Sequence, residues 1–342
     1  MLDIAKNFGK LIMAEHFVLN VIGKHQIILG GRVKIYAQSP CRLSLCGGGS
    51  DTAPYSTLYG GATISLAINI RQKFTLLTDD DQWKGQNLVP YGCKEEFVYA
   101  FRERFGVNSM HHNRFISESD GGIRGGIGSS AAIAVAIVGA LAKEQNKTMT
   151  RSEIAELAWE IETKDLKMFG GKQDQYAAAF GGLNLFEFTD KVSVQPFDRK
   201  YAEGILPSIV LFHTNIERTN NKIQEGFKKL DSKQIKALHE IKSLVIPTVE
   251  AIGNGDIQQL GEILDTAWNL KKKSNKGISN PAIDEIYTKA KKLGAIGGKC
   301  TGAGGGGFMF FVTKDRDKLI KELGIEWWDF GLDSTGLDVR IV

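Results

Sequence analysis

The sequence predicts an α+β protein of two domains. Strand-like segments dominate the chain before about Pro207, whereas helical periodicity dominates after Thr219 and only a few strands follow. A run of strands followed by a run of helices is typical of separate α+β domains. The chain has 342 residues, enough for two domains of ordinary size. We therefore expect one domain at residues 35–206 and a second at residues 207–342.

Residues 1–34 stand apart from these domains. Their apolar stretches are interrupted by charged side chains, among them Lys6, Lys10 and Lys24. They contain no apolar core followed by a small-residue cleavage site, so they do not resemble a signal peptide. We expect an N-terminal arm or a cloning-derived extension, and we assign it no function.

The first domain alternates short strands and two helices. Residues 34–38, 61–70, 74–78 and 183–188 have strand character; just past the boundary, 208–213 resembles a buried strand. Helices are predicted at 129–146 and from a Thr150 or Ser152 cap to about Lys167. Three carboxylates at 79–81 mark a turn; an acidic turn of this kind is more often solvated than a metal site.

The second domain is mostly helical. Helical periodicity covers residues 220–230, 233–252, 256–270 and 281–293. A glycine-rich segment at 294–307 leads into an aromatic strand at 308–313, and residues 338–342 can form a last strand.

Composition and charge exclude several classes of protein. Hydrophobic residues make up 42% and charged residues 24% of the chain, as in soluble globular proteins. A net charge of +4 does not indicate a nucleic-acid partner, although it suits a phosphorylated substrate. No run reaches the roughly 18 apolar residues of a membrane span. Four scattered cysteines without metal-binding spacing indicate reduced thiols, so we expect a cytoplasmic protein.

The central motif is GGIRGGIGSSAA at residues 121–132. Five glycines precede Ser129 and Ser130, and a strong helix-forming run follows them. A glycine-rich turn at a helix N-terminus directs free N–H groups and the positive end of the helix dipole at an anion. The serine hydroxyls can cap the helix, contact a phosphate or reach Mg²⁺. A simple tight turn needs only one glycine, so this density favours a nucleotide phosphate site.

Two other nucleotide motifs fit this segment less well. No lysine follows the last glycine, which excludes a Walker A loop. Gly126 to Ala131 does match G-x-G-x-x-A of dinucleotide-binding folds. That fold needs a buried strand before the turn and an acidic residue about 20 residues later. Residues 113–120 are polar and residues 147–150 hold no carboxylate, so the Rossmann interpretation is the weaker one.

Two carboxylates and an arginine are candidates for phosphoryl-transfer chemistry. Glu162 lies near the end of a predicted helix, and Asp174 follows Gly170 and Gly171 in what we expect to be a constrained loop. Phosphoryl transfer to a hydroxyl needs a carboxylate on Mg²⁺ and a group that orients the hydroxyl. Arg42 could stabilise the transferred charge. The alternatives are a solvated helix face for Glu162 and a surface arginine for Arg42.

Two further glycine-rich segments are candidates for ligand-binding loops. Residues 47–51 (GGGSD) place Asp51 where it can bind sugar hydroxyls, and residues 297–307 hold seven glycines before a strand. A cationic cluster of Lys271, Lys272, Lys273 and Lys276 precedes the last segment. It is either a solvated lysine face or a site for an anionic substrate group.

These three motifs, in this order, resemble the GHMP kinase superfamily. The matching segments are Pro40-x-Arg42 with residues 47–51, residues 126–131, and residues 299–307 (KCTGAGGGG). Residues 47–51, 170–176 (GGKQDQY) and 297–299 further resemble the bacterial kinases of D-glycero-D-manno-heptose phosphates. Galactokinases carry Glu-His where Gly48 and Gly49 stand here, and Gly122 replaces the proline that usually opens the second motif.

The resemblance implies a fold and an activity. The fold would be a GHMP kinase fold, with a ribosomal-S5-like N-terminal domain, a ferredoxin-like C-terminal domain and the active site in the cleft between them. The enzyme would use ATP and Mg²⁺ to phosphorylate the anomeric hydroxyl of a heptose 7-phosphate. Fucose, another hexose or an isoprenoid precursor as the acceptor, and a non-catalytic sugar- or nucleotide-binding paralogue, remain as alternatives. A homodimer is one option for its assembly.

The resemblance also implies roles for individual residues. Asp174 would be the catalytic base with Arg42 beside it, and Glu162 and Ser130 would hold Mg²⁺. ATP phosphates would lie in the loop formed by Gly125, Gly126, Ile127, Gly128, Ser129, Ser130 and Ala131. The acceptor would contact Gly49, Asp51, Gly304 and Gly305, and its own phosphate would meet Lys172, Arg218, Lys272 or Lys276.

Overall fold

The computed structural model describes residues 20–21, 27–28, 33–77, 95–106, 114–120, 125–217, 230–275 and 277–342. The acidic turn at 79–81, residues 220–229 of the helix expected at 220–230, and Gly122, Arg218 and Lys276 lie outside these ranges.

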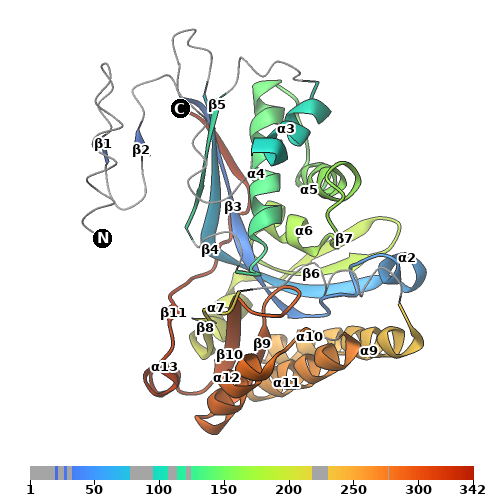
Figure 1. Cartoon of the computed structure of the whole chain (residues 1–342), viewed down its shortest axis with the longest axis vertical. Coiled ribbons are helices and arrows are strands. Elements are labelled where there is room, and N and C mark those ends of the chain that lie inside the picture. Colours follow the sequence, from blue (N-terminus) through green and yellow to red (C-terminus); the bar gives the residue numbers. More distant parts are fainter. Residues whose placement is uncertain are drawn as a thin grey trace.

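Two antiparallel sheets with their helices and one two-stranded pair make up the part of the chain that the structure describes (Figure 1). The larger sheet has six strands, in the order β12-β3-β4-β6-β7 with β5 also paired to β4; these strands are β3 (Val33–Cys46), β4 (Gly61–Leu77), β5 (Arg114–Ser119), β6 (Leu183–Phe188), β7 (Val192–Pro196) and β12 (Asp338–Ile341). The smaller sheet has the order β11-β8-β10-β9; these strands are β8 (Ile209–His213), β9 (Ala295–Cys300), β10 (Phe308–Thr313) and β11 (Trp327–Trp328). A two-stranded pair joins β1 (Asn20–Val21) to β2 (Ile27–Ile28).

The described helices divide between the two sheets. Those of the first part are α2 (Tyr55–Tyr59), α3 (Glu95–Arg104), α4 (Ser129–Glu144), α5 (Arg151–Glu160), α6 (Gln173–Phe180) and α7 (Arg199–Ile205). Those of the second part are α9 (Ser232–Ser243), α10 (Val245–Asn254), α11 (Ile257–Ser274), α12 (Pro281–Lys292) and α13 (Arg316–Leu323). A π-helical turn, Ile161–Asp165, continues α5, and a 3₁₀ turn, Leu206–Ser208, leads into β8.

The smaller sheet has the topology that the ferredoxin-like expectation requires. Its strands occur along the chain as β8, β9, β10 and β11, and their spatial order corresponds to 4-1-3-2. Helices α9 to α12 connect β8 to β9, and α13 connects β10 to β11, which gives the split βαβ arrangement. The prediction of a ferredoxin-like second domain is confirmed.

Strand β10 is buried on both faces and joins two hydrophobic cores. Successive side chains of a strand point to opposite faces, so Phe308 and Phe310 belong to a core shared with the larger sheet. Met309 and Phe311 belong to a second core, which also contains Trp268 of α11. The first core continues through β3, β4 and the apolar helix α4. The two parts of the chain therefore pack on one continuous core along β10.

The last strand does not stay with the smaller sheet. β12 pairs antiparallel with β3, with Asp338 opposite Gln38 and Ile341 opposite Ile35. The chain therefore leaves the larger sheet before β8 and returns to it at its C-terminal end, as Figure 1 shows.

Several elements differ from the sequence-based expectations. Residues 114–119 form β5 despite their polar character, because Phe115 and Ile116 are buried while β5 pairs along β4. The helix expected at 233–252 is two helices that meet at Leu244, three residues before Pro247. Helix α6, strand β9 and helix α13 form where we expected loops or made no assignment. The Thr150 cap of α5 is confirmed: it forms a capping box with Glu153.

Candidate active site

The glycine-rich loop lies against strand β3. Past Gln38 the edge of β3 is no longer covered by β12, and the Arg42 amide donates to the Ile127 carbonyl at 2.8 Å. The Arg42 guanidinium also donates from Nη1 to the Gly126 carbonyl at 3.0 Å. Gly128 has a φ of +81° and directly precedes α4. The predicted turn into a helix N-terminus is present, and Arg42 fixes its position.

Arg42 and Asp174 form a two-pronged ion pair. Arg42 Nε lies 2.8 Å from Asp174 Oδ1, and Arg42 Nη2 lies 2.6 Å from Oδ2. The arginine side chain is 4% exposed, whereas that of Asp174 is 32% exposed. A Cβ at Gly128 would lie 3.5 Å from Asp174 Oδ2, so the glycine loop borders the carboxylate directly. The carboxylate therefore lies next to the loop and is open on one side.

Asp174 lies in the first turn of helix α6, and the expectation of a loop at this position was wrong. The preceding residue anchors the helix start to the sheet. Gln173 donates from Nε2 to Ser65 Oγ at 2.6 Å and accepts from Ser44 Oγ at 3.3 Å. These bonds connect α6 to β3 and β4. The position of the carboxylate is thus set by two strands and a helix, not by a flexible segment.

Glu162 and Ser130 form the second carboxylate site. Ser130 Oγ donates to Glu162 Oε1 at 2.7 Å, and Gln175 Nε2 donates to Oε2 at 2.7 Å. Glu162 is 4% exposed, so the solvated-face alternative is wrong. Burial raises the pKa of Glu162 to about 7, and the nearby charge of Asp174 acts in the same direction. The π-helical turn that carries Glu162 directs it inward toward the start of α4.

Asp51 is buried and bonded to the backbone. Its Oδ1 accepts from the Gly49 amide at 3.0 Å, and its Oδ2 accepts from the Gln173 amide at 3.2 Å. Burial, and then the charge of Asp174, raise the pKa of Asp51. Asp51 thereby links the first glycine-rich loop to the start of the helix that carries Asp174.

The third glycine-rich segment meets the phosphate loop. The Gly125 carbonyl accepts from the Phe308 amide at 3.0 Å and from Thr301 Oγ1 at 3.0 Å. The amides of Gly304 and Gly305 donate to Thr301 and Ile278 at 3.4 and 2.8 Å. Within the described residues, the amides of these two glycines therefore hold the backbone of the loop in place.

The two predicted phosphate-binding lysines that the structure describes, Lys172 and Lys272, are already paired with acids. Lys172 Nζ lies 2.7 Å from Glu156 Oε2 and 4.5 Å from the centre of the Trp159 ring. Lys272 lies 3.4 Å from Asp284 and faces the Trp268 and Tyr287 rings. The neighbouring Lys271 donates to the Gly302 carbonyl and so holds the third glycine segment, a contact that neither expectation for the lysine cluster included.

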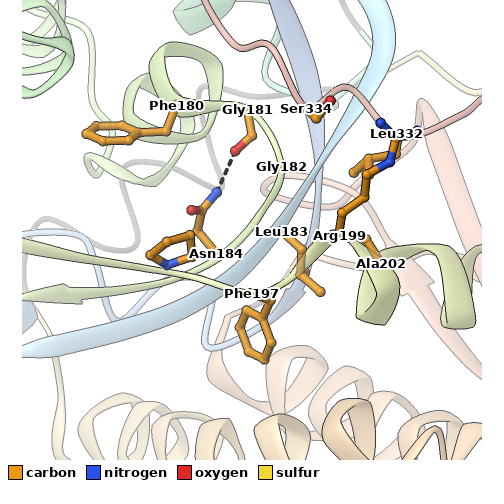
Figure 2. Close-up of a pocket in the computed structure, with 11 residues that line it drawn as sticks. Phe180, Gly181, Gly182, Leu183, Asn184, Phe197, Arg199, Ala202, Leu332 and Ser334 are labelled. Carbon is orange, nitrogen blue, oxygen red and sulfur yellow. Dashed lines mark hydrogen bonds between the residues drawn. The ribbon is translucent and has the colours of Figure 1, made fainter.

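A separate pocket of about 210 Å³ lies at the far end of α6 (Figure 2). Phe180 and Gly181 line it, and Asn184 donates to the Gly181 carbonyl at 2.6 Å. Asp174 lies at the opposite end of this helix and none of the predicted site residues lines the pocket. The pocket is therefore distinct from the candidate site.

Sequence reasoning missed several residues of the site. Gln173 and Gln175 flank Asp174 and bind Ser65 and Glu162, and Thr301 binds Gly125. The glutamines alternate with Asp174 in KQDQY, and this pairing of amides around an acid was the available signal. Lys299 was part of the third motif, but nothing in the sequence indicated its burial.

Comparison with known proteins decides the family. Residues 93–182 match the GHMP kinase N-terminal domain, and residues 248–324 match the GHMP kinase C-terminal domain. The chain is 35% identical to the D-glycero-alpha-D-manno-heptose 7-phosphate kinase of Campylobacter jejuni over 317 residues, which cover 84% of this chain and 93% of that protein. The chain belongs to the GHMP kinase family.

Solved structures agree with this assignment. A D-glycero-D-manno-heptose 1-phosphate kinase from Bacteroides thetaiotaomicron superposes with a TM-score of 0.72 at 28% identity, over 90% of this chain and 99% of that one. Lactococcus lactis galactokinase bound to galactose shares the fold, with a TM-score of 0.66 at 17% identity, over 90% of this chain and 95% of that one. The GHMP kinase fold is confirmed. The Rossmann alternative is wrong, because the larger sheet is antiparallel.

The protein is thus an ATP-dependent phosphotransferase that acts on an alcohol group, with the sugar kinases among its relatives. Among the described helices, none is both long and apolar enough to cross a membrane.

Proposed function

We propose that the acceptor is a heptose 7-phosphate and that the γ-phosphate of ATP is transferred to its anomeric hydroxyl. The Arg42–Asp174 pair beside Gly128 is the observation that carries this proposal, because it brings a partly open carboxylate, a cation and a phosphate-binding turn together. The acceptor class follows from similarity to the Campylobacter jejuni heptose 7-phosphate kinase.

Asp174 orients and accepts the proton of the attacking hydroxyl. Each carboxylate oxygen keeps a lone pair besides the one directed at Arg42, so it can accept a hydrogen bond from the sugar. Arg42 holds the carboxylate in place and donates from Nη1 to the loop carbonyl of Gly126. Its positive charge beside the transferring group offsets charge that develops on the phosphoryl oxygens.

The amides at the start of α4 bind the ATP phosphates. Gly126 and Gly128 both take positive φ angles, and the turn delivers the first amides of α4 without an intrahelical partner. Ser129 and Ser130 begin this helix, and Ala131 follows them without a bulky side chain. The alternative of an ordinary capped turn is disfavoured by the Arg42 and Asp174 contacts around it.

The donor set near α4 fits Mg²⁺. Magnesium is commonly held by one or two carboxylates together with substrate phosphates and water. Glu162 supplies a buried carboxylate and Ser130 a hydroxyl 2.7 Å from it, and Gln175 Oε1 beside them is buried without a hydrogen-bond partner in the described structure. Glu162 and Ser130 would hold the ion, which would neutralise charge on the ATP phosphates.

We also place the enzyme in the cytoplasm. Cys41, Cys46 and Cys300 are buried and form no disulfide, which suits a reducing compartment, and ATP is the donor.

A panel of sugars and sugar phosphates, measured by ADP release with phosphate-position assignment by ³¹P NMR, tests the proposal. We expect heptose 7-phosphate to give the highest kcat/KM, with the new phosphate on the anomeric oxygen. The Asp174→Asn variant should lower kcat by about 10²- to 10⁴-fold while ATP binding persists. A higher kcat/KM for fucose or an unphosphorylated hexose would refute the acceptor assignment.

A further inference from the structure

Lys299 is a buried cation at the junction of the two sheets. It lies on β9 opposite Phe310 of β10 and is 3% exposed. Directly opposite residues in neighbouring strands share a face of the sheet, and Phe310 belongs to the core shared with the larger sheet. The side chain of Lys299 therefore lies on the face that meets β3, the strand of Arg42.

No acid compensates this charge within the described part of the chain. The backbone of Lys299 pairs with β10, but no hydrogen bond or ion pair joins its side chain to a described residue. The groups that act on it electrostatically are the Cys46 thiol at the end of β3, the Arg42 guanidinium and the Cys300 thiol. Burial lowers the pKa of Lys299 to about 8, and the Arg42 charge adds to this effect. An unpaired buried charge is costly, so it needs a compensating anion or a function.

The location of Lys299 limits which anion can reach it. Cys46 immediately precedes the first glycine-rich loop, and Arg42 lies four residues earlier, where it contacts Asp174 and the phosphate loop. Lys299 therefore lies beside the strand that runs from the reacting centre to Gly47. The ATP phosphates have the α4 amides, Ser130 and Arg42 as partners. Of the cations expected at the anionic end of the acceptor, the two that the structure describes, Lys172 and Lys272, are paired with Glu156 and Asp284.

We propose that Lys299 binds an anionic group of the acceptor, a phosphate ester on the sugar. This inference rests on the proposed function and extends it, since it names the residue that distinguishes a sugar phosphate from a free sugar. Lys299 would be an acceptor-binding residue with no part in the phosphoryl transfer.

Matched acceptors test this assignment. KM and kcat are measured for heptose 7-phosphate against heptose, and for mannose 6-phosphate against mannose, with wild type, Lys299→Met, Lys299→Gln and the exposed control Lys321→Met. We expect each Lys299 variant to raise KM for the phosphorylated sugars about 10- to 100-fold. KM for free sugars and for ATP should change less than about twofold, and Lys321→Met should match wild type.

A thermal-shift experiment with inorganic phosphate separates the two proposals. We expect phosphate to raise the midpoint of unfolding of wild type and of Lys321→Met, and to raise that of the Lys299 variants by clearly less, because only the α4 loop remains to bind it. If wild type phosphorylates sugars and the Lys299 variants keep its preference for sugar phosphates, the Lys299 assignment is refuted and the proposed function stands. If wild type phosphorylates no sugar, the proposed function fails, and the phosphate-dependent shift still tests Lys299 as an anion site.

Discussion

The Gly125 carbonyl accepts a hydrogen bond from the Phe308 amide at 3.0 Å, and this bond joins the phosphate loop to the strand β10 of the smaller sheet. Thr301 Oγ1 donates to the same carbonyl at 3.0 Å. The loop that we assign to ATP is therefore held from both sides, by Arg42 on β3 and by the backbone of β10. Substitutions that move either sheet should therefore change the position of this loop and the affinity for ATP.

Gly125→Ala tests this contact. A Cβ at Gly125 would lie 2.4 Å from the Phe308 ring, so the loop or the ring must move. Because misplacing a binding group by about 1 Å can cost 10²-fold in rate, we expect at least a 10-fold rise in KM for ATP. Gly253→Ala is the control, since nothing lies within 4 Å of a Cβ there. The double variant Gly125→Ala/Phe308→Leu should recover part of the loss; no change in KM for ATP in Gly125→Ala would contradict the assignment of the loop.

Arg42→Lys tests the two-pronged pair. A lysine keeps the charge but cannot form both bonds to Asp174 and the bond to Gly126 together. We expect kcat to fall roughly 10- to 100-fold with a smaller change in KM for ATP, measured by steady-state ADP release. Arg104→Lys, which changes an exposed arginine paired with Glu160, is the control and should keep the wild-type kcat. If Arg42→Lys and Arg104→Lys had the same kcat, the paired bonds from the Arg42 guanidinium to Asp174 would not be needed for catalysis.

Glu162→Gln tests the magnesium site. The substitution preserves size but removes the carboxylate charge that Mg²⁺ prefers. We expect the Mg²⁺ concentration for half-maximal activity to rise at least about 10-fold. Glu160→Gln lies two residues earlier, where Glu160 pairs with Arg104 and Lys164 at the surface, and it should leave the titration unchanged. If both titrations overlay that of wild type, the metal ligand lies elsewhere.

Lys299→Met should stabilise the ligand-free protein, and the gain should depend on pH. The folded-state pKa of about 8 lies below the ordinary value of 10.5, so burial penalises the charged form. Below pH 8 both states are protonated and the full penalty, on the order of 3 kcal/mol, acts on the folded state. Between pH 8 and 10.5 the unfolded chain retains a proton that the folded protein has lost, so the wild-type free energy of unfolding rises with pH.

Denaturant unfolding of wild type and Lys299→Met at pH 7, 9 and 10.5 measures this difference. The expected gain of the variant is largest at pH 7 and shrinks toward pH 10.5. If Lys299→Met were less stable than wild type at pH 7, Lys299 would have a structural role and a stabilising partner in the ligand-free protein, which would contradict the proposal.

Local sequence signals predicted the parts of the site that depend on neighbours in the chain. Glycines followed by Ser129 and Ser130 predicted the turn into α4, and Thr150 predicted the start of α5. Helix α6 was missed because two glycines just before it resemble a loop, whereas bonds from Gln173 to Ser44 and Ser65 fix its start. These partners are more than 100 residues away, and local propensity contains no information about them.

The same reason explains the other differences. The polar segment of β5 becomes a strand because β4 offers it a complete set of backbone partners. The burial of Glu162 and of Lys299 depends on how helices and sheets pack, and neither is visible in the charge pattern. The sequence was enough to identify Asp174 as a candidate site residue. It offered Arg42 only as one possible partner, and the structure shows the two side chains 2.6–2.8 Å apart.

The pairing of β12 with β3 has a consequence for synthesis on the ribosome. Strand β3, which carries Arg42, can pair with β12 only after residues 338–341 have been translated, some 300 positions later. Until then the first half of the enzyme emerges with an uncovered sheet edge, which is a template for pairing with other chains. The half that carries the candidate site can therefore reach its final form only after β12 has been made, and a fragment that stops before β12 should aggregate rather than fold.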